Sequence, residues 1–248
     1  MLQPILPNSP LSEVAAEVRF HGSLALLGEW GALQKNLRAE FPKLFVPGAV
    51  VGTSPLLQHV RLGSADDKTF VLLAVNAIAV ATSDYSGFDS FKGLVQRVIK
   101  LFHEQCSAGP MTRFGLRYVN DLPPGYPADA DSGDFHPALK LGVRSWPARS
   151  PKFVGQPQLV LDEERNGLQL RVSISTPEVR VPEILVGGDR QKLRFAFQPG
   201  TRFDLDASRT TELALSRLGA FLDAGHEAIE EIFLGAITPS YHGYLRGS

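Results

Sequence analysis

The sequence predicts an α+β protein in which antiparallel sheets carry helices on one face. Segments with apolar residues at alternate positions, typical of half-buried strands, are interspersed with segments whose apolar residues recur every three or four positions, typical of amphipathic helices. Turn-forming residues separate neighbouring strand segments closely enough for hairpins, and hairpins join antiparallel strands. The composition, 44% hydrophobic and 21% charged over 248 residues, is that of a chain with a folded core.

The first half of the chain, 1–122, has the order strand, helix, two or three strands, helix, strand. The expected strands are 14–20, 57–62, 69–75, 77–82 and 113–121, and the expected helices are 24–41 and 88–102. The apolar residues of both helices recur at helical spacing, and Pro42 ends the first of them. This order resembles a split βαβ unit of ferredoxin type with an added strand, βαββ(β)αβ.

A proline-rich segment, 123–151, separates this first lobe from a second, 152–248. We expect a connection there, with one short helix at 137–141. The second lobe starts with a hairpin of strands 158–162 and 168–175 around Asn166-Gly167, a strong type I′ turn signal. A strand at 192–197, a short extended segment at 202–206 and a long helix at 210–234 follow. The two halves either share one sheet or pack as separate lobes.

Charge and hydropathy restrict the class of protein. The formal net charge of −1 disfavours a duplex nucleic-acid binder, which normally carries a basic excess. No apolar run approaches the about 20 residues that cross a bilayer, and the first residues lack a signal-peptide pattern. The single cysteine, Cys106, cannot form an intramolecular disulfide. These features predict a soluble cytoplasmic protein without a membrane partner.

The strongest candidate site is the expected strand 113–121. Arg113, Gly115, Arg117 and Asp121 share one face of it, and the two arginines lie about 7 Å apart, a spacing that suits a phosphate or a carboxylate between them. The alternative is a solvated sheet face whose arginines pair with Asp121 or with acids on neighbouring strands. The candidate binding residues are Arg113, Arg117, Tyr118, Asn120 and Asp121.

A second candidate lies in the last helix. His226 and Glu230 are four residues apart and share a helical face, an arrangement suited to acid–base chemistry or to metal ligation. No second helix of this kind supplies further ligands, and the second histidine of the zinc-protease motif is missing. The alternative is a histidine hydrogen-bonded at the margin of the core. The chain also lacks a nucleophile elbow and a phosphate loop, so no catalytic residue, metal or cofactor is predicted.

Four segments of the chain resemble a sporadically distributed family of bacterial proteins of about this length. The matching segments are Pro10-Leu11-Ser12-Glu13-Val14, Tyr85-Ser86-Gly87-Phe88-Asp89-Ser90-Phe91, Arg113-Phe114-Gly115-Leu116-Arg117-Tyr118-Val119-Asn120 and Leu222-Asp223-Ala224-Gly225-His226. The resemblance implies a bacterial source and a recurring fold, and it carries no catalytic assignment. It also implies that Arg113, Arg117, Tyr118, Asn120 and His226 stand at the family's signature positions.

Three functional hypotheses follow. The leading one is a non-enzymatic binding protein that uses the Arg113/Arg117 face for a protein or an anionic small molecule, with its oligomeric state open. The second is an enzyme acting on an anionic substrate, with His226 and Glu230 or Asp121 as acid–base groups. It requires a pocket that unites Arg117 with His226. The third, which the sporadic distribution implied by the resemblance suggests, is a regulatory or defence-associated partner protein encoded beside its target.

Overall fold

The computed structural model describes most of the chain. The described ranges are 6–46, 60–106, 108–123, 125–128, 130–132, 136–140, 158–175, 183–186, 189–192 and 201–247. Much of the predicted connection 123–151 lies outside them, and so do residues 193–197 of the predicted strand 192–197 and residues 57–59 of the predicted strand 57–62.

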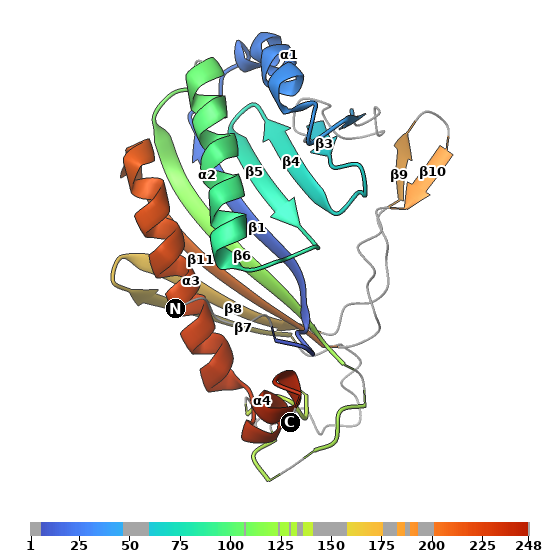
Figure 1. Ribbon diagram of the computed structural model, residues 1–248. Coiled ribbons are helices and arrows are strands. Elements are labelled where there is room, and N and C mark those ends of the chain that lie inside the picture. The colour runs from blue at the N-terminus through green and yellow to red at the C-terminus, as the bar shows by residue number, and fades with distance from the viewer. Residues whose placement is uncertain are drawn as a thin grey trace, which may run out of the picture.

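Nine strands form one antiparallel sheet with the order β2-β3-β4-β5-β1-β6-β11-β8-β7 (Figure 1). Its strands are β1 (Leu11–Phe20), β2 (Lys43–Phe45), β3 (Val60–Gly63), β4 (Thr69–Ala74), β5 (Ala77–Thr82), β6 (Met111–Leu122), β7 (Gln158–Arg165), β8 (Leu168–Ser175) and β11 (Thr201–Leu213). A separate hairpin consists of β9 (Glu183–Val186) and β10 (Asp189–Lys192). Strand β2 is an addition to the predicted elements. The predicted α+β class is confirmed.

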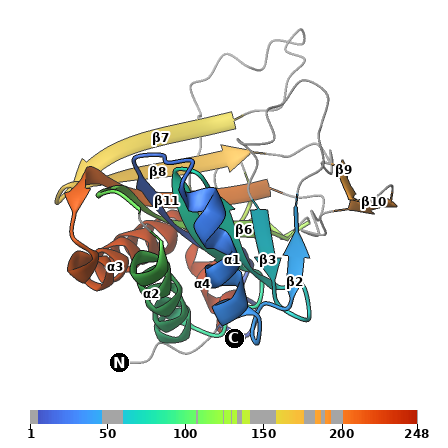
Figure 2. The ribbon, with the colours of Figure 1, turned by 90° about the horizontal axis from the view of Figure 1, so that it is seen from above.

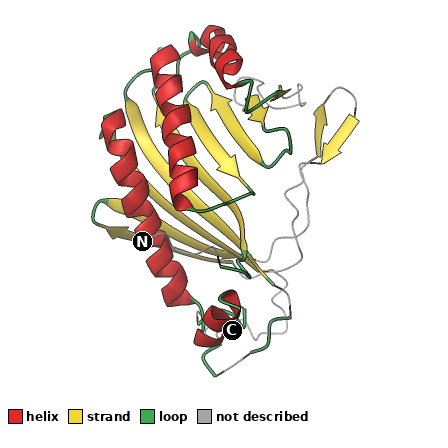
Figure 3. Ribbon diagram, in the orientation of Figure 1, coloured by secondary structure: helices red, strands yellow, loops and turns green. Residues whose placement is uncertain are grey.

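Helices cover one face of the sheet, as predicted (Figures 2 and 3). They are α1 (Leu26–Leu37), α2 (Phe88–Gln105), α3 (Leu218–Ala236) and α4 (Pro239–Leu245). Helix α2 shows the reason, because its apolar residues at spacings of three and four are the buried ones, among them Val95, Val98 and Phe102. No helix in the described part of the chain is both long and apolar enough to cross a bilayer.

The first half has the strand order of a ferredoxin-like unit. Strand β1 lies between β5 and β6, and β4 lies on the far side of β5. Helix α1 follows β1, and helix α2 connects β5 to β6 across the covered face (Figure 1). Strands β2 and β3 extend this unit at the edge beyond β4. The predicted βαββ(β)αβ pattern is therefore present with one strand more than predicted, because β2 precedes the predicted added strand β3.

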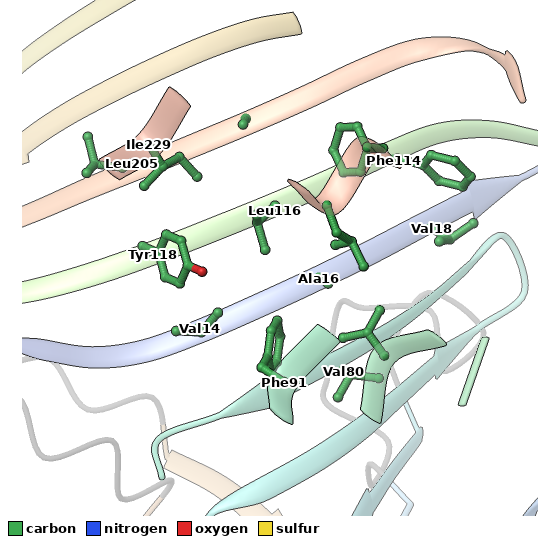
Figure 4. Packing of buried hydrophobic residues seen from close by; sticks show 14 of the residues in the cluster. Val14, Ala16, Val18, Val80, Phe91, Phe114, Leu116, Tyr118, Leu205 and Ile229 are labelled. Atoms are coloured by element: carbon green, nitrogen blue, oxygen red, sulfur yellow. The ribbon is translucent and has the colours of Figure 1, made fainter. Parts of the chain in front are cut away.

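The two halves of the chain share one continuous sheet. Strand β6 pairs with β1 on one side and with β11 on the other, so that Leu116 lies opposite both Ala16 and Ala207. The buried side chains of both halves also form one cluster. Figure 4 shows members from β1, β5, β6, β11, α2 and α3, among them Val14, Val80, Phe91, Phe114, Leu116, Leu205 and Ile229. The sequence left open whether the two halves share one sheet or pack as separate lobes, and the structure has one shared sheet.

Two predicted boundaries in the second half are wrong. The strand through Arg202 continues to Leu213, so the helix expected from residue 210 begins at Leu218, after a 3₁₀ turn η3 (Leu215–Arg217). Thr210 pairs with Arg113 of β6, and β-branched residues such as threonine favour a pleated strand over a helix. The short helix expected at 137–141 is absent from the described residues 136–140, which form a turn and an isolated bridge to Ile237.

The hairpin predicted at Asn166-Gly167 is confirmed. Asn166 has a φ of 54° and Gly167 a φ of 72°. Both central residues of a type I′ turn require a positive φ, which glycine adopts without strain and asparagine tolerates better than most residues. The turn sets the register of β7 against β8, in which Arg165 lies opposite Leu168.

Candidate functional site

Strand β6 divides its side chains between the two faces of the sheet as its sequence predicts. Phe114, Leu116 and Tyr118 are buried beneath the helices (Figure 4). Arg113 and Arg117 project from the opposite, helix-free face. Because β6 is an inner strand of the sheet, with β1 and β11 beside it, both arginines are within reach of side chains from two neighbouring strands.

The helix-free face carries an open trough with a volume of about 520 Å³, and both arginines line it. We call this feature the trough. The charged groups along it include Glu13, Glu17, Arg113, Arg117, Asp204 and Asp206. Its apolar part is built by Ala15, Leu72, Ala79 and Ala81. The volume falls within the about 300–1,000 Å³ that is common for small-molecule sites.

Arg117 is held by Asp204 of β11. Its Nε donates to Asp204 Oδ1 over 2.8 Å, and its Nη2 donates to Asp204 Oδ2 in the second bond of a bidentate pair. The Asp204 side chain is 18% exposed and that of Arg117 is 48% exposed. The hydrogen bonds to Asp204 raise the pKa of the Arg117 guanidinium. This geometry fixes the guanidinium plane at the trough surface.

Arg113 bridges two carboxylates by folding over Gly115. Its Nη1 donates to Glu17 Oε1 over 2.9 Å, and its Nη2 donates to Asp206 Oδ2 over 3.4 Å. A Cβ at position 115 would lie 2.9 Å from Arg113 Nη1, so the glycine leaves the space that the guanidinium occupies. Glu17 also accepts from Arg19 Nε over 2.6 Å. The alternative in which the arginines pair with acids on neighbouring strands is therefore realised inside the trough.

Burial disfavours the ionised form of two carboxylates of the trough. Burial raises the pKa of Glu13, against the opposing influence of Arg117 and Arg202. Burial likewise raises the pKa of Asp206, although Arg113 lies beside it. Partial removal from water disfavours the ionised form of an acid unless a cation compensates. At both positions the available cations compensate only in part.

The apolar end of the trough is built mainly from alanine side chains. Ala15 lies opposite Ala81 across β1 and β5, and the next row places Ala79 opposite Leu72. Farther along the same face, the Arg61 guanidinium lies 4.2 Å from the ring centre of Phe45 and 4.4 Å from that of Phe70. Such stacking over aromatic faces stabilises a guanidinium that has lost part of its water.

The other predicted candidates on β6 do not line the trough. Asn120 is buried on the helix side, and its Nδ2 donates to the Phe203 carbonyl over 3.2 Å. Asp121 accepts from Arg202 Nε over 3.1 Å and from Arg202 Nη2 over 3.4 Å. Tyr118 also points to the helix side. Of the five candidate binding residues, the structure thus brings Arg113 and Arg117 together in the trough.

His226 lies at the margin of the core, on the far side of the sheet from the trough. Its Nδ1 is 3.0 Å from the Tyr118 hydroxyl, and its ring stacks on Phe88 with 4.0 Å between ring centres. The Tyr118 hydroxyl also lies 3.4 Å from that of Tyr85. Burial lowers the pKa of His226. Tyr85, Phe88, Tyr118 and His226 come from three of the segments on which the family resemblance rests.

This placement separates the groups that the enzyme hypothesis needs to unite. Arg117 and Tyr118 are neighbours on β6 and therefore project to opposite faces, so Arg117 is in the trough while His226 contacts Tyr118 beneath the helices. Glu230 follows His226 by one turn of α3. Within the described residues, no three His, Cys, Asp or Glu side chains gather closely enough to hold a metal ion.

Sequence reasoning missed the acidic partners of the arginines. Glu13 and Glu17 alternate on β1, and Asp204 and Asp206 alternate on β11, so each pair shares the trough face. The alternation itself was the available signal. Strand β11 pairs with β6, which lies far earlier in the sequence, as in the pairing of Asp204 with Val119, and local patterns do not report such a tertiary contact.

No family model and no curated protein matches this chain. The resemblance to the bacterial family therefore stays a prediction.

Proposed function

We propose that this protein is a non-enzymatic binding protein whose ligand or protein partner docks in the trough beside Arg113 and Arg117. The observation that carries the proposal is a concave, charged surface at the centre of the sheet, on the face that the helices leave free. Sites that recognise ligands commonly combine an apolar wall with a few oriented polar groups, and the trough has both.

The ion pairs support a binding role, because they orient the trough before a ligand arrives. Asp204 holds Arg117 through two hydrogen bonds, and Glu17 and Asp206 hold Arg113 from two different strands. A group that is already ordered loses less conformational entropy when it binds. The enzyme alternative has no comparable support, since His226 contacts the opposite face of the sheet.

The proposal is tested by replacing Arg113 and Arg117 of the trough. We expect the double variant Arg113→Ala/Arg117→Ala to lose the partners and small ligands that the wild-type protein retains from a native lysate, as measured by quantitative mass spectrometry. The matched control is Arg97→Ala, because Arg97 also forms a bidentate pair, with Glu40, but outside the trough. If the double variant keeps its fold by circular dichroism and retains the same partners and ligands as the control, the trough is not the binding surface.

A further inference from the structure

The trough contains one carboxylate that no other described group neutralises. Glu13 has no hydrogen bond and no ion pair among the described residues, although it lines the trough and is largely buried. The cations that act on it over a longer range are Arg117 and Arg202. Both are already engaged, Arg117 with Asp204 and Arg202 with Asp121. Carboxylates taken from water are as a rule paired, so the pairing capacity of Glu13 is left for a ligand.

The arginines of the trough, in contrast, all have carboxylate partners. Arg117 pairs with Asp204, Arg113 with Glu17 and Asp206, Arg19 with Glu17, and Arg171 with Asp162. An anionic ligand is the class that two arginines alone would suggest. Such a ligand would have to displace one of these carboxylates, and it would be repelled by the others along the trough. A positively charged ligand, in contrast, can pair with the Glu13 carboxylate without displacing any of these ion pairs.

The surface beside Glu13 is apolar and consists mainly of short alanine side chains. Ala15 is two residues farther along β1 on the same face, and it lies opposite Ala81. The row of Ala79 and Leu72 comes next. A hydrocarbon chain can lie on such a floor while a charge at its end reaches the carboxylate, which is how lysine and arginine side chains cover apolar surfaces.

We propose that the trough binds an aliphatic cation, an alkylammonium or alkylguanidinium group whose charge pairs with Glu13 and whose hydrocarbon chain lies over Ala15 and Ala81. This inference rests on the proposed function and names the ligand class for the same site. A small free amine and a lysine or arginine side chain of a peptide share this chemistry.

The pH dependence of binding follows from the groups around Glu13. Four charged groups act on Glu13 electrostatically: Arg117 and Asp121 of β6, and Arg202 and Asp204 of β11. The two arginines stay protonated throughout the accessible range, and each aspartate holds one of them. Burial raises the pKa of Glu13 above its ordinary value of 4.5. Cation binding requires the ionised form, so affinity falls as the pH drops through this raised pKa.

The test uses four probes that share a butyl chain: n-butylammonium, n-butylguanidinium, n-butanol and n-butyrate. Each is titrated into the full-length protein, and NMR signals of Ala15, Ala79 and Ala81 are followed. We expect both cations to shift these signals at lower concentration than butanol or butyrate. Glu13→Gln should weaken cation binding about tenfold or more. Glu104→Gln, which changes an exposed carboxylate on α2, should have no effect.

Several results would overturn the inference. If butyrate shifts the alanine signals at lower concentration than the cations, the trough is an anion site, and the proposed function stands without this ligand class. If Glu13→Gln binds the cations as the wild type does, Glu13 is not the anchor. If neither cation shifts the signals, the ligand class is wrong, and the comparison of the Arg113→Ala/Arg117→Ala variant with Arg97→Ala decides the proposed function separately.

A further arm identifies the source of the cation. Putrescine represents small free amines, and N-acetyl-lysine-N-methylamide represents a peptide side chain. Tighter binding of putrescine supports the inference with a small amine as ligand. Tighter binding of the lysine derivative supports it with a peptide segment as ligand. If neither putrescine nor the lysine derivative shifts the NMR signals of Ala15, Ala79 and Ala81, the inference is contradicted.

Discussion

The ion pair between Arg117 and Asp204 can be measured by a double-mutant cycle. Replacing each residue by alanine, singly and together, isolates the coupling energy between them. Exposed pairs contribute about 0.2–1 kcal/mol, whereas breaking a buried pair costs about 3–5 kcal/mol. Asp204 is 18% exposed and Arg117 48%, and two hydrogen bonds join them, so we expect a coupling of about 1–2 kcal/mol.

The two single variants of this cycle should differ. Arg117→Ala leaves Asp204 without its partner in a trough that also contains Glu13 and Asp206. Asp204→Ala leaves Arg117 among those same carboxylates, which compensate in part. We therefore expect Arg117→Ala to lower the free energy of unfolding more than Asp204→Ala does.

Urea unfolding of the four proteins, followed by circular dichroism, gives the coupling energy. The control is the same cycle at Arg171 and Asp162, a bidentate pair on strands β7 and β8 whose side chains are 61% and 59% exposed. Its coupling should be smaller than that between Arg117 and Asp204, because both of its side chains are well exposed to water and the attraction is screened. A coupling between Arg117 and Asp204 no larger than that of the control, or a larger cost for Asp204→Ala than for Arg117→Ala, would refute the reasoning.

Three further predictions concern single residues. Because burial raises the pKa of Glu13 above 4.5, its ionised form destabilises the fold at neutral pH, and this penalty decreases as the pH falls through the raised pKa and is lost below 4.5. Glu13→Gln should therefore raise the free energy of unfolding, measured with urea, by about 0.5 kcal/mol at pH 7 and leave it unchanged at pH 4. A variant with a lower free energy of unfolding than the wild type at pH 7 would contradict this prediction. Gly115→Ala should displace the Arg113 guanidinium and lower the free energy of unfolding in urea by less than about 1 kcal/mol. In a protein that already carries Arg113→Ala, the same substitution should not lower it. Equal decreases in both proteins would speak against the contact between Arg113 and position 115. The pKa of His226, measured by NMR, should lie below its ordinary 6.5, so that its contribution to stability is lost as the pH falls below 6.5; a value above 6.5 would be incompatible with its burial.

Local patterns predicted those parts of the fold that local physics determines. The alternation of Phe114, Leu116 and Tyr118 with Arg113 and Arg117 assigned each side chain to the correct face, because a strand places successive residues on opposite sides. The type I′ turn and the helical spacing of α2 were predictable for the same reason. His226 was also placed correctly as a hydrogen-bonded residue at the core margin.

The remainder depended on contacts between distant segments. Strand β11 continues to Leu213 because Thr210 pairs with Arg113, 97 positions earlier in the sequence, and no local signal reports that pairing. The partners of Arg113 and Arg117 were unknown for the same reason, since Glu17 lies on β1 and Asp204 on β11. Without those partners the arginines suggested an anionic ligand. With them, attention moves to Glu13, which lines the trough without a hydrogen bond or an ion pair among the described residues.

The most direct measurement is a crystal structure of the protein soaked in n-butylammonium. We expect density in the trough, with the ammonium within hydrogen-bonding distance of the Glu13 carboxylate and the butyl chain over Ala15 and Ala81. This expectation is contradicted if the probe binds only on the helix-covered side or elsewhere on the surface, or if Glu13 turns out to be paired with Arg117 while the trough contains no ligand.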